Sequence, residues 1–265
     1  MTPTLAPLPT TVASHVRPGL RIGHVWVDAV TLDGALDAIE ELVWAGVGGS
    51  VYTPNVDHIV QVERQPAFRA VYERVSLSLP DGVPVVWASR LLGDPLPERV
   101  AGIDLMARLV EAAEEHGYRV FFLGATPGVL ARAVAELRAR HPRLHVAGAR
   151  DGYFRPDEES AVREEIRAAA PDILFVAMGS PRKEHWVAAA PDLDVGFAMG
   201  VGGSLDVIAG HVRRAPRLVQ RLGLEWLFRL AQEPRRLVRR YVTTNTRFLL
   251  LLTRELTHRR IEVTS

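Results

Sequence analysis

The sequence predicts an α/β protein with a Rossmann-like parallel sheet flanked by helices, followed by an all-helical, basic C-terminal appendage. Two observations predict this fold class. From residue 21 to residue 210, short apolar runs alternate with amphipathic stretches, and strands that alternate with helices form parallel sheets covered on both faces. After residue 210 the strand-like runs stop and only helical periodicity remains. The chain is 48% hydrophobic and 24% charged, as is usual for a globular protein with a core.

The predicted elements follow one another without an internal repeat. The strands are short apolar runs at residues 22–27, 50–53, 76–79, 119–123, 144–147, 173–178 and 195–199. The helices have helical spacing of apolar residues and cover residues 32–44, 56–74, 83–92, 105–116, 127–140, 157–169, 183–190 and 205–209. A longer amphipathic helix is predicted from residue 235 to about residue 257, with one face formed by Val238, Tyr241, Val242, Asn245, Phe248, Leu249 and Leu252.

Three segments follow from this pattern. Residues 1–20 are rich in proline and threonine and lack the apolar run of a signal peptide, so we expect a disordered leader. Residues 21–210 form the predicted Rossmann-like domain, and residues 211–265 form the appendage. The most apolar tract, residues 248–252, is much shorter than the about 20 residues that span a bilayer, so we expect no membrane span.

Charge is distributed unevenly along the chain. Residues 211–265 hold 13 arginines, no lysine and 4 glutamates and so carry about +9, against +1 for the whole chain, which leaves about −8 for residues 1–210. A basic tail on an acidic body indicates that the tail meets something anionic, either phosphates or a lipid surface. The chain has no cysteine, which excludes disulfides, thiolate metal sites and cysteine nucleophiles.

Polar or glycine-rich loops follow five of the predicted strands. Because ligands of open parallel sheets bind at the carboxyl ends of the strands, these loops predict a nucleotide site on one rim of the sheet. They are Thr53-Pro54-Asn55, Pro80-Asp81-Gly82, Gly124-Ala125-Thr126-Pro127-Gly128, Gly179-Ser180-Pro181 and Gly200-Val201-Gly202-Gly203-Ser204.

Asp81 stands at the tip of a predicted strand, directly before a glycine. One interpretation is structural, because aspartate in this position commonly forms a turn or caps the next helix. The other is chemical, because a general base needs the same exposed yet sheltered position. The local sequence leaves both interpretations open.

Glycines and one lysine are further candidates on the same rim. Gly124, Gly200 and Gly202 lie in loops that open helices, where backbone N–H groups attract phosphate. The third glycine of the dinucleotide fingerprint is missing after Gly202, so NAD binding has weak support. Lys183, the only lysine of the chain, falls in the first turn of a predicted helix, where it either reaches a substrate or pairs with a neighbour such as Glu184 in solvent.

No pattern in the sequence predicts a metal ion or another cofactor. Asp192-x-Asp194 resembles the motif of metal-dependent sugar transferases, but it precedes a predicted strand and therefore lies at the opposite end of the sheet. The histidines show no pairing at metal-ligand spacing.

The motifs together, in their order along the chain, resemble the WecG/TagA/CpsF glycosyltransferases, family 26 of the sugar transferases, over about residues 21–250. The segments that carry the resemblance are Thr53-Pro-Asn55, Pro80-Asp-Gly82, Glu98-Arg-Val-Ala-Gly-Ile-Asp104, Phe122-Leu-Gly124, Asp151-Gly-Tyr-Phe154, Asp172-Ile-Leu-Phe-Val-Ala-Met-Gly-Ser-Pro181, Gly200-Val-Gly-Gly-Ser-Leu-Asp206, Arg214-Ala-Pro216 and Gly223-Leu-Glu-Trp-Leu-Phe-Arg-Leu-Ala-Gln-Glu-Pro-Arg-Arg236.

This resemblance implies an inverting, metal-independent enzyme that moves a sugar, often N-acetylmannosamine, from a UDP-sugar to an undecaprenyl-diphosphate-linked acceptor. Such enzymes act in teichoic acid or surface polysaccharide synthesis, peripherally at the cytoplasmic face of the plasma membrane. The resemblance implies Asp81 as base, with Thr53, Asn55 and Lys183 also at the catalytic centre. It implies a substrate-binding set of Arg99, Asp104, Gly124, Gly200, Gly202, Asp206, Arg229, Arg236 and Arg239.

Two positions depart from the family pattern. Lys183 stands where the family usually has glutamine, which leaves the transferred sugar open and makes a donor such as UDP-glucose or a uronic acid an alternative. Pro84 replaces a usual glycine at a helix start, where proline is tolerated. Two other classes of protein, a nucleic-acid-binding protein with an arginine-rich arm and a nucleotide-binding oxidoreductase, explain only the tail or only the sheet. The sequence does not fix an oligomeric state.

Overall fold

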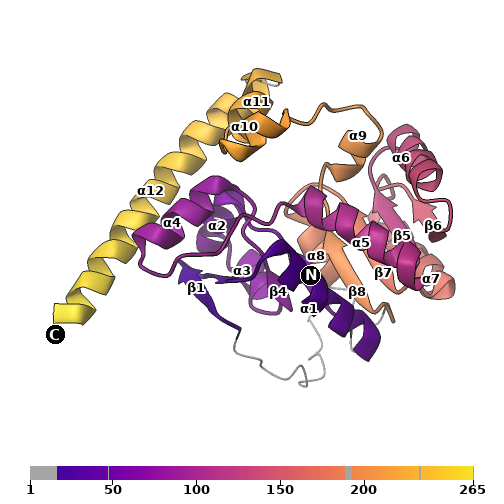
Figure 1. Ribbon diagram of the computed structural model, residues 1–265, viewed down its shortest axis with the longest axis horizontal. Coiled ribbons are helices and arrows are strands. Elements are labelled where there is room, and N and C mark those ends of the chain that lie inside the picture. The colour runs from indigo at the N-terminus through magenta and orange to yellow at the C-terminus, as the bar shows by residue number, and fades with distance from the viewer. Residues whose placement is uncertain (1–16, 47, 189–192, 233, 265) are drawn as a thin grey trace.

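A six-stranded parallel sheet forms the centre of the molecule, as the sequence predicts. The computed structural model describes residues 17–46, 48–188, 193–232 and 234–264, and Figure 1 shows the sheet between two layers of helices. The strand order is β4-β3-β8-β7-β5-β6, and every pairing in it is parallel. The strands are β3 Ser50–Tyr52, β4 Leu77–Ser78, β5 Arg119–Gly124, β6 His145–Arg150, β7 Ile173–Ala177 and β8 Phe197–Gly200.

The central strands are apolar at every position because both of their faces are covered. In β7, Ile173 and Phe175 pack into one core cluster, whereas Leu174 and Val176 pack into another on the opposite face. Consecutive side chains of a strand point to opposite faces, so a continuous apolar run is what a doubly covered strand needs. The first face is covered by α1 Leu32–Ala45, α5 Gly102–His116, α6 Pro127–Arg140 and α9 Ser204–Ile208. The second is covered by α7 Glu159–Ala169 and α8 Arg182–Ala188.

The first predicted strand, residues 22–27, is wrong, because this segment forms an antiparallel hairpin. β1 Gly19–Ile22 pairs with β2 Val25–Asp28. Gly23 at the turn has φ of 57°, a left-handed conformation that glycine adopts at little cost. β1 begins at Gly19, inside the segment for which the sequence predicts a leader. That prediction otherwise concerns residues 1–16, which lie outside the described part of the chain.

The predicted helix over residues 56–74 divides into α2 Val56–Arg64 and α3 Pro66–Tyr72. Pro66 causes the break: a proline disfavours helical backbone in the residue before it, and Gln65 has φ of −123° and ψ of 100°. The remaining helices are α4 Val83–Leu91, the 3₁₀ helix η1 Pro156–Glu158, α10 Arg217–Arg221, α11 Glu225–Gln232 and α12 Pro234–Thr264.

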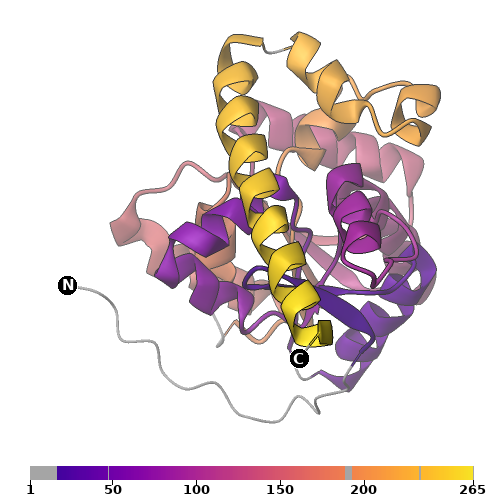
Figure 2. The ribbon, with the colours of Figure 1, turned by 90° about the vertical axis from the view of Figure 1, so that its left-hand side faces the viewer.

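The appendage is built into the body of the molecule. α12 has 31 residues and is longer than predicted. Figures 1 and 2 show it running along one side of the body, beside α2 and α4. Its Phe248, Leu251 and Leu252 are buried in the same core cluster as side chains of α2, α3 and α4. The segment that begins after residue 210 therefore completes a hydrophobic core.

Some of the basic residues of the appendage pair with acidic residues of the body. Arg254 contacts Glu63 of α2 at 3.4 Å, and Arg259 contacts Asp94 at 2.6 Å. Part of the charge asymmetry seen in the sequence is thus satisfied inside the molecule. No helix within the described residues combines the length and apolar character that crossing a membrane requires.

Candidate active site

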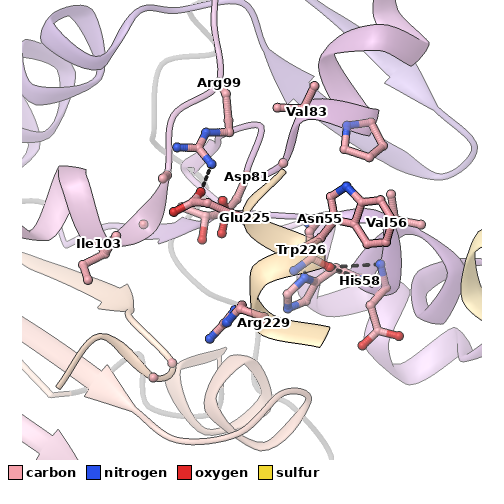
Figure 3. Close-up of a pocket in the computed structure, with 18 of the residues that line it drawn as sticks. Asn55, Val56, His58, Asp81, Val83, Arg99, Ile103, Glu225, Trp226 and Arg229 are labelled. Atoms are coloured by element: carbon pink, nitrogen blue, oxygen red, sulfur yellow. Dashed lines mark hydrogen bonds and ion pairs between the residues drawn. The ribbon is translucent and has the colours of Figure 1, made fainter. Parts of the chain in front are cut away.

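A cavity of about 590 Å³ lies at the carboxyl ends of β3, β4 and β8, and residues of the appendage form part of its wall. It falls where ligands of open parallel sheets are expected and within the size range of ligand pockets. Figure 3 shows part of its lining, with both polar and apolar side chains. The polar and charged residues that line it include Thr53, Asn55, Asp57, His58, Asp81, Arg99, Lys183, Arg213, Arg214, Glu225, Arg229, Arg240, Thr244 and Asn245.

Asp81 lines this cavity and does not cap a helix. The residue at the cap of α4 is Gly82, with φ of 127°, and α4 has no side-chain cap. The loop of Asp81 is held by its backbone N–H, which donates to the carbonyl of Pro54 at 3.0 Å. Of the two interpretations that the sequence leaves open, the structure excludes the helix cap. The carboxylate stays available for chemistry.

The surroundings of Asp81 make its carboxylate a stronger base than usual. Burial raises the pKa of Asp81, the nearby Arg99 guanidinium opposes that rise, and Glu225 adds to it. Figure 3 shows Asp81 beside the ion pair between Arg99 and Glu225. Because a general base works best when its pKa approaches the working pH, this shift has the direction that proton abstraction needs.

Thr53 and Asn55 follow β3 and also line the cavity. Asn55 caps α2: its side-chain oxygen accepts from the N–H groups of Asp57 and His58, and its own N–H donates to Nδ1 of His58. Capping occupies the amide oxygen, so the amide nitrogen is the group of Asn55 that can donate to a ligand. Thr53 Oγ1 would lie 3.1 Å from a Cβ at Gly102, and glycine there lets α5 begin close to the Thr53 hydroxyl.

Lys183 pairs with Glu184, as one of the two sequence interpretations predicts, but the pair is buried and does not lie in solvent. The Lys183 and Glu184 side chains are 9% and 1% exposed and form an ion pair. Nε2 of His58 lies 3.3 Å from Oε1 of the same carboxylate. Burial alone would raise the pKa of Glu184, but the His58 hydrogen bond and the Lys183 ammonium outweigh it and lower that pKa to about 2. Lys183 lines the cavity, but the charge of its ammonium group is already matched by the Glu184 carboxylate.

Gly200 makes room for the side chain of Lys183. A Cβ at Gly200 would stand 2.8 Å from Cε of Lys183, so the lysine stem occupies the space beside this backbone. Gly202, by contrast, has φ of 51°, and nothing lies within 4 Å of a Cβ placed there. Both glycines line the cavity, but of the two only Gly202 leaves open space for a ligand against its backbone.

Arg99 and Asp104, predicted to bind substrate, hold the appendage against the body. Arg214 makes two hydrogen bonds of 2.7 Å to Asp104, one to each carboxylate oxygen. Arg99 pairs with Glu225 at the start of α11, and Arg214 also lies 3.6 Å from Glu225. We call these four residues the latch. Arg99 lines the cavity, whereas Asp104 is not among the residues that line it.

Two other predicted substrate-binding residues lie outside the lining. Gly124 has φ of 123°, and a Cβ there would meet the carbonyl oxygen of Ala177 at 2.3 Å. This glycine therefore allows close packing of β5 on β7. Asp206 lies beside the cavity: its Oδ2 and Nη2 of Arg229 are each 3.8 Å from the point where a Cβ on Gly203 would stand.

Of the three predicted arginines of the appendage, the structure places one in the cavity. Arg229 lines it, Arg239 is exposed and does not, and the side chain of Arg236 lies outside the described residues. Arg240, which sequence reasoning missed, lines the cavity on α12. Helical periodicity contains the signal, because Arg240 is four residues before Thr244 and eight before Phe248, both on the cavity wall.

The part of the chain that the structure describes holds no group of three or more histidine, aspartate or glutamate side chains arranged to bind a metal ion. Of the Asp192-x-Asp194 motif, Asp192 lies outside the described residues. Asp194 precedes the amino end of β8, away from the cavity.

The cavity at the rim of the parallel sheet brings the Asp81 carboxylate together with Arg99, Arg229 and Arg240. Comparison with known proteins gives the class. The profile described as the glycosyl transferase WecG/TagA/CpsF family matches residues 20–262. The chain is 37% identical over 190 residues, 71% of its length and 73% of the relative's, to a Bacillus spizizenii protein named N-acetylglucosaminyldiphosphoundecaprenol N-acetyl-β-D-mannosaminyltransferase. The chain belongs to the WecG/TagA/CpsF family and is a glycosyltransferase.

Proposed function

We propose that this enzyme moves N-acetylmannosamine from its UDP-sugar to N-acetylglucosamine carried on undecaprenyl diphosphate. The observation that carries the proposal is the placement of Asp81 in a cavity that several arginines also line. The Asp81 side chain does not cap a helix, and its pKa is raised. The similarity to a relative whose name gives this sugar and this acceptor supports the choice of both.

The residues of the cavity support a single displacement with inversion. Asp81 accepts the proton of an acceptor hydroxyl while that oxygen bonds to the anomeric carbon of the donor. The bond from this carbon to the diphosphate oxygen breaks, and UDP leaves with the bonding electrons. Arg229, which lines the cavity, stabilises the negative charge that develops on the leaving diphosphate.

The pairing of Lys183 supports a neutral sugar over an acidic one. A free ammonium at this position would favour a uronic acid donor. The ammonium is instead matched by the buried Glu184 carboxylate, and a second carboxylate beside this pair would lack a partner at a high cost in desolvation. An N-acetylated neutral sugar needs only hydrogen bonds, which the amide of Asn55 and the hydroxyl of Thr53 supply.

A panel of UDP-sugars tests the donor. UDP release is measured with N-acetylmannosamine, N-acetylglucosamine, glucose and glucuronic acid donors, each with and without the diphosphoundecaprenol-linked acceptor. We expect acceptor-dependent release with UDP-N-acetylmannosamine at a kcat/KM at least tenfold above the other donors. Preference for the glucuronic acid donor would contradict the proposal and would return Lys183 to the role of a sugar ligand.

We also propose that the enzyme works peripherally on the cytoplasmic face of the membrane that carries its acceptor. Exposed arginines of α12, among them Arg239 and Arg247, and exposed apolar side chains such as Leu227 and Val242 support this location. Basic and apolar side chains on one amphipathic segment are what binds an anionic lipid surface.

A further inference from the structure

The cavity extends beyond the polar site into a stretch lined by apolar side chains. Val83, Trp87 and Leu91 of α4 form one wall of this outer stretch, and Phe248, Leu249 and Leu252 of α12 form the other. We call it the apolar passage. It is continuous with the space around Asp81, because all of these residues line the same cavity.

Both walls run outward from the catalytic end. α4 starts two residues after Asp81, and Val83, Trp87 and Leu91 follow at intervals of four, so they share one face of the helix. At the far end of α4, the carbonyl of Leu92 accepts a hydrogen bond of 2.7 Å from Arg259 of α12. This hydrogen bond links the two helices at the far end of the passage.

α12 changes along its length in the same direction. The residues that it presents to the cavity are first Arg240 and Tyr241, then Thr244 and Asn245, and finally the apolar residues Phe248, Leu249 and Leu252. Thr244 donates a hydrogen bond of 3.2 Å to Asp57 of α2, which fixes the middle of this series. With a rise of about 1.5 Å per residue, the series from Arg240 to Leu252 covers about 18 Å.

We propose that the apolar passage holds the first isoprene units of the acceptor. This inference rests on the proposed function, and it adds where the acceptor runs. A lipid-linked sugar presents a hydroxyl, then a diphosphate, then a hydrocarbon chain. The cavity presents Asp81, then Arg240, then apolar walls, and so matches that order. Leu249 and Trp87 are left exposed on these walls, and a hydrocarbon chain is the ligand that would cover them.

The chain offers a matched pair of variants to test this passage. Leu249 and Leu250 are neighbours on α12 with exposed fractions of 62% and 64%, but only Leu249 is among the described residues that line the cavity. Leu249→Gln and Leu250→Gln remove equal apolar surface from the helix. General contact with a lipid surface predicts equal effects of the two substitutions, whereas the passage predicts a difference.

The experiment measures binding of farnesyl diphosphate to each full-length variant by calorimetry, and the KM for the diphosphoundecaprenol-linked acceptor. We expect Leu249→Gln to weaken both about tenfold, as loss of a buried apolar contact does, and Leu250→Gln to leave both near the wild-type values. Trp87→Gln should act like Leu249→Gln, and Trp44→Gln on the distant α1 like Leu250→Gln. Equal effects of Leu249→Gln and Leu250→Gln would overturn the proposal. If the wild type transfers no sugar, the proposed function fails, and the binding comparison still decides whether the passage exists.

Discussion

At the scale of single residues, the site separates side chains that build the loops from side chains left free to react. Asn55 and Asp81 both follow a strand and precede a helix, and aspartate and asparagine are equally good caps. Asn55 caps its helix, whereas Asp81 leaves that position to Gly82. Asp81 therefore does not stabilise the protein by capping a helix, and burial destabilises its ionised form.

Asp81→Asn should stabilise the protein at neutral pH. The folded state raises the pKa of Asp81, so its stabilising contribution is present below the unfolded pKa of about 3.9 and is lost as the pH rises through the folded value. At pH 7 the neutral amide avoids the cost of a buried charge. Thermal unfolding should give a higher midpoint for Asp81→Asn at pH 7 and equal midpoints near pH 3. A lower midpoint at pH 7 would contradict this account of Asp81.

Residue types and their order predict that Asp81 and Arg229 belong to the site at the rim of the sheet, and both line the cavity. They do not predict that Lys183 is buried or that Gly200 makes room for its side chain. The burial of Lys183 depends on three separate segments: Glu184 beside it, His58 on α2 and the missing Cβ of Gly200. No single window of sequence contains these contacts. The sequence predicts phosphate contact at Gly200 and Gly124, because glycine lets a ligand approach the backbone closely. Glycine equally lets other parts of the protein approach, and at these two positions Lys183 and Ala177 do so.

At the scale of secondary structure elements, the latch determines where the appendage sits. Arg99 and Asp104 belong to the body, and Arg214 and Glu225 belong to the segment after residue 210. Their pairing places α11, which carries Arg229, over the cavity.

The apolar face predicted for α12 is only partly correct. Phe248 and Leu252 are buried, but Val238, Val242 and Leu249 are exposed. Leu237, Thr244 and Leu251, which lie outside the predicted face, are buried instead. Periodicity identifies a candidate face, but it does not determine which elements cover the helix.

Asp104→Asn should loosen the latch without unfolding the sheet. The amide cannot accept the paired hydrogen bonds from Arg214 with a charged oxygen, and charged hydrogen bonds are worth about 1.5–3 kcal/mol. Amide hydrogen exchange of α11 should become faster, and kcat/KM for the donor should fall about tenfold. Asp33→Asn, which removes an exposed ion pair with Arg108 on the surface, should change neither. Unchanged exchange in α11 of Asp104→Asn would show that the latch does not hold the appendage.

At the scale of the whole molecule, an acidic body and a basic tail meet across a shared core. Arg214, Arg254 and Arg259 pair with the body, while Arg239 and Arg247 are exposed. Removing residues 211–265 would also remove Phe248, Leu251 and Leu252 from the core. A truncated protein could lose membrane binding simply because it no longer folds. Substitution of exposed arginines tests membrane binding without removing core residues.

The double variant Arg239→Gln and Arg247→Gln should bind anionic vesicles more weakly and keep its fold. Each arginine near an anionic surface contributes about 1 kcal/mol, so the loss of two should weaken binding roughly 30-fold. Sedimentation with vesicles containing phosphatidylglycerol measures this, and the difference from wild type should shrink in high salt. Equal sedimentation of both proteins in low salt would contradict a role for this surface.

The central claim is that Asp81 accepts the proton of the acceptor during sugar transfer. The most direct measurement compares the rate of transfer and the donor affinity of Asp81→Asn with those of the wild type. Asp57→Asn is the control, since Asp57 lines the same cavity but its carboxylate is bonded by Gln61 and Thr244. The account predicts that Asp81→Asn transfers sugar about 10²–10⁴-fold more slowly and binds the UDP-sugar as the wild type does, while Asp57→Asn stays within about tenfold of the wild-type rate. Transfer by Asp81→Asn at a rate close to that of the wild type would contradict it.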